Sequence, residues 1–231
     1  MKGLSFEVES PYFSCFRTPT STSLLLTFSV PPFTTVRGLI ANCMGLPRFP
    51  EYSEQLVLQQ KMKIGIQTIN LNDVIRDKSV ELCKLLKLVS REKWEDAPRP
   101  KPWTFPSSPI FKEFLVNPRY KIFIVADEKT ISDVYSGVMD PKRPLYLGQS
   151  DDMVDIYNIQ VTDFLEAKSS EIWSLVEGVH ENCEVVKLPY TFSEDGKSLN
   201  KMTLSIPLKY PQKLKNEVAC YKVNDEFVTA Y

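Results

Sequence analysis

The order in which two hydrophobic periods alternate along the chain constrains its fold more than any other feature. Residues 3–9 alternate between apolar and polar side chains, and this period of two is typical of a strand. Residues 36–44 carry apolar side chains at the spacing of one helix face, and residues 61–69 return to the period of two. The chain is therefore expected to begin as strand, helix and strand.

The ends of this first helix carry their own signals. A hydroxyl of Thr34 or Thr35 can accept a hydrogen bond from the free N–H groups of the first turn, so one of them is predicted to cap the helix. Gly45 can adopt the left-handed conformation that ends a helix, and Pro47 prevents continuation. We therefore expect the helix to end just before Gly45.

The same pattern recurs later in the chain. Strands are expected at 119–126 and 153–161, and a helix at 128–136 that ends at Gly137. The combined order is βαββαβ, the pattern of the ferredoxin-like (RRM-like) α+β fold. Residues 70–118 then form a long insertion between the second and third strands, where antiparallel pairing allows a hairpin tip to accept one.

The insertion and the last third of the chain have weaker patterns. The insertion is predicted to begin with a short helix that contains Leu82, Leu85, Leu86 and Val89. It is predicted to end in a proline-rich run that excludes a regular helix or a central strand. Residues 163–231 are predicted to form a small β-rich C-terminal unit beside a ferredoxin-like domain of residues 1–162. Its expected elements are a helix at 170–177 and strands at 183–188, 202–206 and 217–223.

Composition excludes several classes of protein. No apolar run approaches the roughly 18 residues of a membrane span, and the start lacks the apolar core of a signal peptide, so we expect a cytoplasmic protein. The 5 cysteines form no CxxC pair, which argues against a disulfide framework or a zinc site. Residues 1–150 hold 20 basic and 15 acidic side chains, whereas residues 151–231 hold 8 and 14. A polyanion, if one binds, should therefore meet the first part.

The sequence is poorly equipped for catalysis. It contains one histidine, His180, and neither of the common glycine-rich motifs that bind phosphate groups in nucleotide-binding enzymes. The adjacent carboxylates Asp151 and Asp152 are expected to be solvated turn residues. We therefore expect no catalytic residue, no metal and no cofactor.

Residues 10–37 are better suited to RNA. The segment is rich in hydroxyl side chains and contains two arginines, which suit phosphate and 2′-OH groups. Tyr12, Phe13 and Phe16 can stack on splayed bases. The same composition also fits an ordinary hydroxyl-rich loop with phenylalanines in the core, so the chemistry alone leaves RNA binding open.

The same region resembles the N-terminal signature of family five of the CRISPR-associated (Cas) proteins. In that signature a strand leads to a segment ending in Phe-Arg, then to a Ser/Thr-rich stretch, and then to a helix start with the pattern P-P-x-T-T. Here the matching residues are Phe13, Phe16, Arg17, Pro31, Pro32, Thr34, Thr35, Gly38, Leu39 and Gly45. Residues 144–154, PLYLGQSDDMV, resemble a second block of the family. One departure is Ser10, where a glycine often stands.

The resemblance implies a ferredoxin-like protein of the RAMP superfamily that works in Cascade, the type I surveillance complex of antiviral defence. Members of the family cap the crRNA at its 5′ handle. They contact the backbone subunit, which is Cas family seven, and the large subunit, and they meet target DNA only indirectly, through the complex. No membrane is involved. The insertion at 70–118 matches the position of the β-hairpin thumb that the family usually extends.

The resemblance and the side-chain chemistry together predict RNA-binding residues in three places. The first loop and the start of the first helix would hold the handle phosphates, through Arg17, Thr18, Ser21, Thr22, Ser23, Thr35 and Arg37. A turn would line the same cleft, through Tyr146, Gly148 and Gln149. The thumb would grip RNA or pack on a neighbouring subunit, through Lys84, Lys87, Arg91 and Lys93.

Two alternatives to a non-catalytic RNA-binding subunit remain open. One branch of the family cleaves the CRISPR repeat as a metal-independent endoribonuclease with a Tyr, Lys and His cluster, for which this chain offers only His180. The other alternative is a module that binds protein only, with the acidic last third as its docking surface. Binding and cleavage assays with a crRNA that has an intact 5′ handle distinguish the three.

Overall fold

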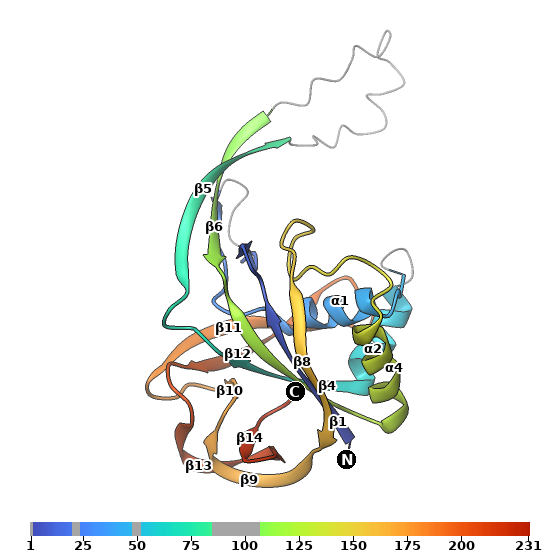
Figure 1. Ribbon diagram of the computed structural model, residues 1–231. Coiled ribbons are helices and arrows are strands. Elements are labelled where there is room, and N and C mark those ends of the chain that lie inside the picture. The colour runs from blue at the N-terminus through green and yellow to red at the C-terminus, as the bar shows by residue number, and fades with distance from the viewer. Residues whose placement is uncertain (1, 20–23, 48–51, 85–106) are drawn as a thin grey trace.

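The central element of the protein is a four-stranded antiparallel sheet. The computed structural model describes residues 2–19, 24–47, 52–84 and 107–231 (Figure 1). The strand order in the sheet is β4-β7-β1-β8, and each neighbouring pair is antiparallel. These strands are β1 (Lys2–Glu9), β4 (Met62–Thr68), β7 (Arg119–Ala126) and β8 (Asp155–Asp163), so all four strands predicted from the period of two are confirmed.

Three helices are present in the described residues, and they lie beside one face of this sheet (Figure 1). Two predicted helices are confirmed as α1 (Phe33–Cys43) and α4 (Glu128–Met139). The helix α2 (Tyr52–Lys61) was not predicted. Within the described residues, no helix is both long enough and apolar enough to span a membrane.

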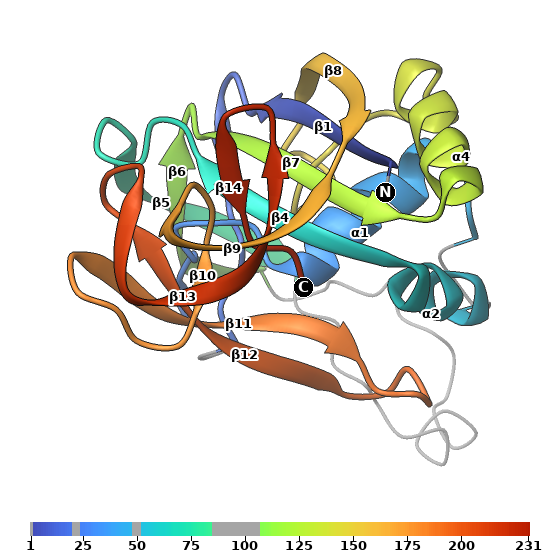
Figure 2. The same ribbon diagram turned by 90° about the horizontal axis from the view of Figure 1, so that it is seen from below.

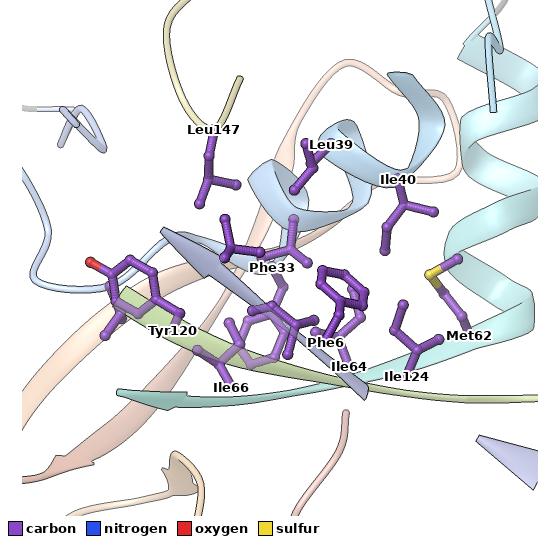
Figure 3. Close-up of a cluster of buried hydrophobic side chains, with 14 of the residues drawn as sticks. Phe6, Phe33, Leu39, Ile40, Met62, Ile64, Ile66, Tyr120, Ile124 and Leu147 are labelled. Atoms are coloured by element: carbon purple, nitrogen blue, oxygen red, sulfur yellow. The ribbon is translucent and has the colours of Figure 1, made fainter. Parts of the chain in front are cut away.

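The main core lies between α1 and the sheet (Figure 3). Its large side chains are nearly all at most 2% exposed, with Tyr120 at 3% and Leu58 at 6%, and burial of one such side chain contributes about 1.5–3 kcal/mol. The sheet provides Phe6, Ile64, Ile66, Ile122 and Ile124, and α1 provides Phe33, Leu39 and Ile40. These alternating positions explain why the period of two located the strands.

The helix ends differ in part from the prediction. The N-cap of α1 is Pro32, which makes no side-chain hydrogen bond, and the two threonines lie inside the first turn, so the predicted threonine cap is wrong. Gly45 has a φ of 72° and confirms the predicted left-handed end. Gly137 does not end α4, which continues to Met139. A Cβ at Gly137 would lie 3.0 Å from a side-chain carbon of Met44, so this glycine allows α4 to pack closely against the end of α1.

The opposite face of the sheet is covered by strands from the end of the chain (Figure 2). The strands β9 (Leu165–Ile172), β13 (Gln212–Val223) and β14 (Glu226–Val228) form one antiparallel sheet. Tyr221, Val223 and Val228 of these strands, together with Phe164 just before β9, pack against Phe123 and Val125 of β7. A Cβ at Gly65 would lie 2.6 Å from the carbonyl oxygen of Thr229. The strands β1, β4 and β7 are therefore mostly buried on both faces, whereas the edge strand β8 remains partly or fully exposed along its length.

A second small sheet completes this region. Its strands are β10 (Val176–Glu177), β12 (Leu199–Pro207) and β11 (Cys183–Phe192), in that order. The three strands predicted after residue 180 are confirmed as β11, β12 and β13, but the helix predicted at 170–177 is wrong. The backbone N–H of Leu175 donates to the carbonyl of Ile66, so β4 uses this segment as an extended neighbour. The domain boundary at residue 162 stays a prediction.

The insertion contains a long two-stranded ribbon that projects from the body (Figure 1). Its strands are β5 (Ile75–Lys84) and β6 (Ser107–Val116), which pair residue by residue over their whole length. The short strands β2 (Phe13–Ser14) and β3 (Leu24–Leu25) also pair with β6. The helix predicted to include Leu82 is wrong because this residue belongs to β5; its other members, Leu85, Leu86 and Val89, lie outside the described residues.

Two buried charges fix the base of the ribbon. Lys112 is 2% exposed and its Nζ lies 3.0 Å from Oε1 of Glu81 on the other strand. Glu113 is 6% exposed, and its Oε2 accepts a hydrogen bond of 3.0 Å from the N–H of Thr27. The same oxygen lies 3.5 Å from Nη1 of Arg76. The ribbon is thereby joined to the segment that follows β3.

Candidate nucleic-acid interface

A groove of about 190 Å³ lies between α1 and the loop of residues 143–149. One wall is the exposed side of α1 and the other is the loop, with α2 and the end of β11 closing the ends. The groove is lined by Thr34, Thr35, Gly38, Leu39, Asn42, Leu46, Gln55, Arg143, Tyr146, Gly148 and Phe192. It combines hydroxyl, amide, guanidinium and aromatic groups on one concave surface.

The wall formed by α1 includes the start of the helix. The N–H groups of Thr35 and Val36 donate to the carbonyl of Pro32, and the cap Pro32 supplies no side-chain acceptor for the remaining first-turn N–H groups, those of Phe33 and Thr34. Thr34 and Thr35 add two partly exposed hydroxyls. A Cβ placed at Gly38 would have no atom within 4 Å, so the groove is open at this position. This wall suits an anion, because the helix dipole and free N–H groups both favour negative charge.

The wall formed by the loop is held in place by side-chain to backbone hydrogen bonds. Asn42 of α1 donates from Nδ2 to the carbonyl of Pro144 at 2.6 Å. The exposed Arg143 donates from Nη1 to the carbonyl of Leu46 at 2.8 Å and from Nη2 to that of Gly45 at 3.0 Å. Both contacts join the loop to α1 and to the residues just after it. The guanidinium of Arg143 thus lies at the edge of the groove.

Asp152 joins this loop to the segment after β1. Its side chain is fully buried, and Oδ2 accepts hydrogen bonds from the N–H of Cys15 at 2.8 Å and from that of Gln149 at 3.2 Å. Burial raises the pKa of the Asp152 carboxyl, against the lowering effect of these two hydrogen bonds. The expectation that both neighbouring carboxylates are solvated is therefore wrong for Asp152 and right for the exposed Asp151.

Gly148 makes the close approach of these two segments possible. Its φ is 113°, a backbone conformation that side chains with a Cβ rarely adopt. A Cβ there would also lie 3.0 Å from Oδ2 of Asp152 and 3.0 Å from the carbonyl oxygen of Cys15. The two sequence blocks that carry the family resemblance are thus adjacent in space, although the contact between Cys15 and Asp152 spans 137 positions of the chain.

The structure brings together only some of the predicted RNA-binding residues. Thr35, Tyr146 and Gly148 line the groove, and Gln149 lies beside it through its hydrogen bond to Asp152. Arg17 is exposed and forms a β-bridge with Thr27, two residues after the contact at Cys15. The N–H of Thr18 donates to the carbonyl of Leu26 at 2.8 Å.

The remaining members of the predicted set lie elsewhere. Lys84 ends β5, at the end of the ribbon that points away from the body (Figure 1). The other loop and thumb residues lie outside the described residues, namely Ser21, Thr22, Ser23, Lys87, Arg91 and Lys93. Their predicted roles stay predictions.

Arg37 was predicted to be a phosphate ligand, but the structure buries its side chain. Its side chain is 6% exposed, and it donates from Nη1 to the carbonyl of Tyr190 and from Nη2 to that of Tyr231. The guanidinium carbon lies 5.4 Å from the centre of the Tyr190 ring. Burial lowers the pKa of Arg37 to about 10. This cation joins α1 to the last strands instead of facing solvent.

Three residues of this region were missed. Arg143 directly precedes the PLYLG block, and a basic residue next to that motif was an available signal. Asn42 is a polar residue between apolar positions of the predicted helix, which was a second signal. No local pattern distinguishes Asp152 from Asp151, because its burial depends on Cys15.

His180 lies in the turn between β10 and β11, where it has structural contacts. Its Nε2 is 2.9 Å from the carbonyl oxygen of Glu177, and its N–H donates to Oγ of Ser205 at 2.9 Å. Across the described residues, no group of three or more His, Cys, Asp or Glu side chains is arranged to hold a metal ion.

Comparisons with known proteins bear on the whole chain. The family model described as CRISPR-associated protein (Cas_Cas5) matches residues 3–217. A chain from a solved CRISPR RNA-guided surveillance complex is similar, with a TM-score of 0.53 and 13% identity over 93% of this chain and 91% of that chain. A CRISPR protein from Archaeoglobus fulgidus has a TM-score of 0.54 and 13% identity, over 99% of this chain and 98% of that chain. No curated protein matches the sequence.

Proposed function

Since this chain belongs to the Cas5 family of CRISPR-associated proteins, we propose that it is a non-catalytic, RNA-binding subunit of a type I CRISPR surveillance complex. In this role it holds the 5′ handle of the crRNA and caps the backbone filament in antiviral defence. The match to the family model confirms the resemblance seen in the two sequence blocks. The RNA-binding role is supported by the groove.

The observation that carries the proposal is the meeting of the two family blocks along one groove. A phosphate of the handle would lie at the start of α1, where free N–H groups and the hydroxyls of Thr34 and Thr35 can donate to it. Arg143 would neutralise a neighbouring phosphate, and Tyr146 offers an aromatic face to a splayed base. Arg17 would extend this surface beyond the groove.

The overall architecture supports the same role. We interpret the sheet order β4-β7-β1-β8, with α1 and α4 as its connecting helices, as the ferredoxin-like arrangement of the RAMP superfamily. The ribbon of β5 and β6 extends away from the sheet, where it can meet the backbone subunit or the RNA (Figure 1). Target DNA would be met only through the assembled complex.

The test is binding of a synthetic crRNA with an intact 5′ handle to the Arg143→Ala variant. We expect its affinity to fall about 5–20-fold and its salt slope to decrease by roughly 0.7–1, since one phosphate contact is lost. Lys142→Ala is the matched control, because this neighbouring cation is exposed and pairs with Asp140 at 2.5 Å. Its affinity should stay within about twofold of the wild type.

The competitor is the same RNA with a scrambled handle, and a denaturing gel detects cleavage. Handle-selective binding without cleavage supports the proposal. Equal salt-dependent affinity of wild type and Arg143→Ala would remove the groove from RNA binding, and cleavage by the wild type would favour the endoribonuclease alternative.

A further inference from the structure

A second cavity, of about 300 Å³, opens on the helical side of the molecule. It lies between the end of α1, one side of α2 and the first turns of α4. Met44, Leu46, Val57 and Leu58 form its apolar lining, and Glu54 and Asp133 stand on its polar side. Among its lining residues, the cavity shares only Leu46 with the groove of the candidate nucleic-acid interface.

The apolar part of this cavity is accessible from outside. Leu58 is 6% exposed and belongs to the main core, whereas Val57 beside it is 46% exposed. Water beside these apolar side chains finds no hydrogen-bond partner on them. An apolar group of a partner that displaces this water therefore stabilises the complex by about 25 cal/mol for each Å² of apolar surface that becomes buried. The size suits one large aliphatic or aromatic side chain.

The charges around the cavity select the kind of partner. Glu54 and Asp133 are exposed, and neither forms an ion pair within the described part of the chain. Lys61 is the one cation among the lining residues. This acidic excess disfavours a phosphate backbone and favours a peptide that carries Lys or Arg next to an apolar side chain.

The position of the cavity indicates where such a peptide comes from. Leu46 lines both this cavity and the RNA groove, and its carbonyl oxygen accepts the hydrogen bond from Arg143. A protein segment in the cavity would therefore lie next to the bound handle, a placement that rests on the proposed function. We propose that this cavity is the docking site for a neighbouring protein subunit of the CRISPR complex, through one apolar side chain flanked by a basic residue.

The experiment is assembly of the complex with Val57→Glu. This chain is co-expressed with crRNA and with the other protein subunits of the complex, purified through a tag on this chain, and weighed by native mass spectrometry. Val161→Glu is the matched control, because Val161 is 47% exposed but lies on β8. We expect Val57→Glu to lose one protein subunit and Val161→Glu to keep every subunit at the wild-type ratio.

A charge reversal tests whether the partner presents a basic residue beside its apolar side chain. Glu54→Lys combined with Asp133→Lys should reduce the occupancy of the same subunit at least fivefold. Thermal unfolding of the isolated variants within about 3 °C of the wild type shows that they fold. Retention of every subunit by Val57→Glu, or loss of the same subunit from both valine variants, would overturn the proposal.

The outcome is independent of the RNA assay. Handle binding is measured on the isolated Val57→Glu variant and is expected within twofold of the wild type. If Arg143→Ala binds the handle normally while Val57→Glu still loses its subunit, the docking site stands and the RNA groove does not. A wild-type homodimer that Val57→Glu dissociates would instead assign the cavity to a second copy of this chain and overturn the proposal.

Discussion

Helix α1 carries polar residues on two sides, one buried inside the protein and the other open to solvent. On one side Arg37 is buried against Tyr190 and Tyr231, beneath the end of the chain. On the other side Thr34, Thr35 and Gly38 border an open groove. The sequence placed Arg37 and Thr35 in one phosphate site, yet the structure separates them. The comparison teaches that on this helix the covering strands, and not the residue type, decide which polar group is available to a ligand.

The two arginines near α1 show the same contrast. The pKa of Arg37 is lowered to about 10 because the protein removes water from its charge. Backbone carbonyls and an aromatic ring replace that water. Arg143 also binds two carbonyl oxygens, but it remains exposed and borders the groove. Arg37 is therefore expected to contribute to stability and Arg143 to RNA binding.

The largest expected effect is the loss of stability in Arg37→Ala. This variant removes the packing of the long side chain, the contact with the Tyr190 ring and two hydrogen bonds, so the free energy of unfolding should fall by about 3 kcal/mol. Urea unfolding followed by tryptophan fluorescence measures it. Handle affinity of the folded variant, measured well below its unfolding temperature, should stay within about twofold.

Arg143→Ala is the natural control for this variant, since its unfolding free energy should change by less than about 1 kcal/mol. A stable Arg37→Ala protein that loses handle affinity would break the comparison, because it would place Arg37 in contact with RNA.

The second-largest effect is expected for Asp152, the side chain that holds the loop of residues 143–149 in place. Asp152→Ala removes the acceptor of two buried N–H groups, those of Cys15 and Gln149, and should cost about 2 kcal/mol or more. Asp152→Asn keeps one oxygen that can accept both hydrogen bonds and removes the buried charge. Its unfolding free energy at neutral pH should equal or exceed that of the wild type. Equal losses in both variants would show that the charge itself holds the loop.

The comparison of Asp152→Asn with the wild type also predicts how the free energy of unfolding depends on pH. Burial raises the pKa of Asp152 in the folded protein above the ordinary value of 3.8. The folded state then binds more protons than the unfolded chain between these two values, so this carboxyl lowers stability as the pH rises through that range. The difference between Asp152→Asn and wild type should therefore grow from low pH to neutral pH. A difference that stays constant with pH would contradict the raised pKa.

The sequence predicted the central sheet well for a physical reason. The residues of β1, β4 and β7 that belong to the main core occupy every second position, so the apolar period survives in the sequence itself. The helix α2 was missed because its apolar residues, Leu56 to Leu58, are consecutive and mark no single face. The start of the insertion was predicted as a helix because Leu82, Leu85, Leu86 and Val89 have helical spacing, and that local pattern contains no information about the pairing of β5 with β6.

The candidate site was predictable only where its residues belong to a motif. Thr35, Tyr146 and Gly148 stand in the two family blocks, and they do line one groove. The positions of Arg37 and Asp152 depend on partners more than a hundred residues away, such as Tyr190 and Cys15. Local patterns contain no information about such partners, so Arg37 was assigned to a phosphate site and Asp152 to a solvated turn.

The smallest expected effects come from two glycines on opposite walls of the groove. Gly148→Ala introduces a Cβ at a φ of 113°, in contact with Asp152 and the carbonyl of Cys15, and should cost about 1–2 kcal/mol. Gly38→Ala adds a Cβ in open space on a helix and should gain roughly 0.5–1 kcal/mol. Thermal unfolding measures both changes.

Handle binding then separates the two walls of the groove. Gly148→Ala moves the Tyr146 turn and should weaken binding severalfold, whereas Gly38→Ala leaves the backbone unchanged and adds only one methyl group. A larger side chain at the same place, Gly38→Glu, would put a negative charge beside the start of α1, where the phosphate is proposed to lie. It should remain as stable as Gly38→Ala and bind the handle more weakly. Full binding by Gly38→Glu would show that the open side of α1 is not where RNA lies.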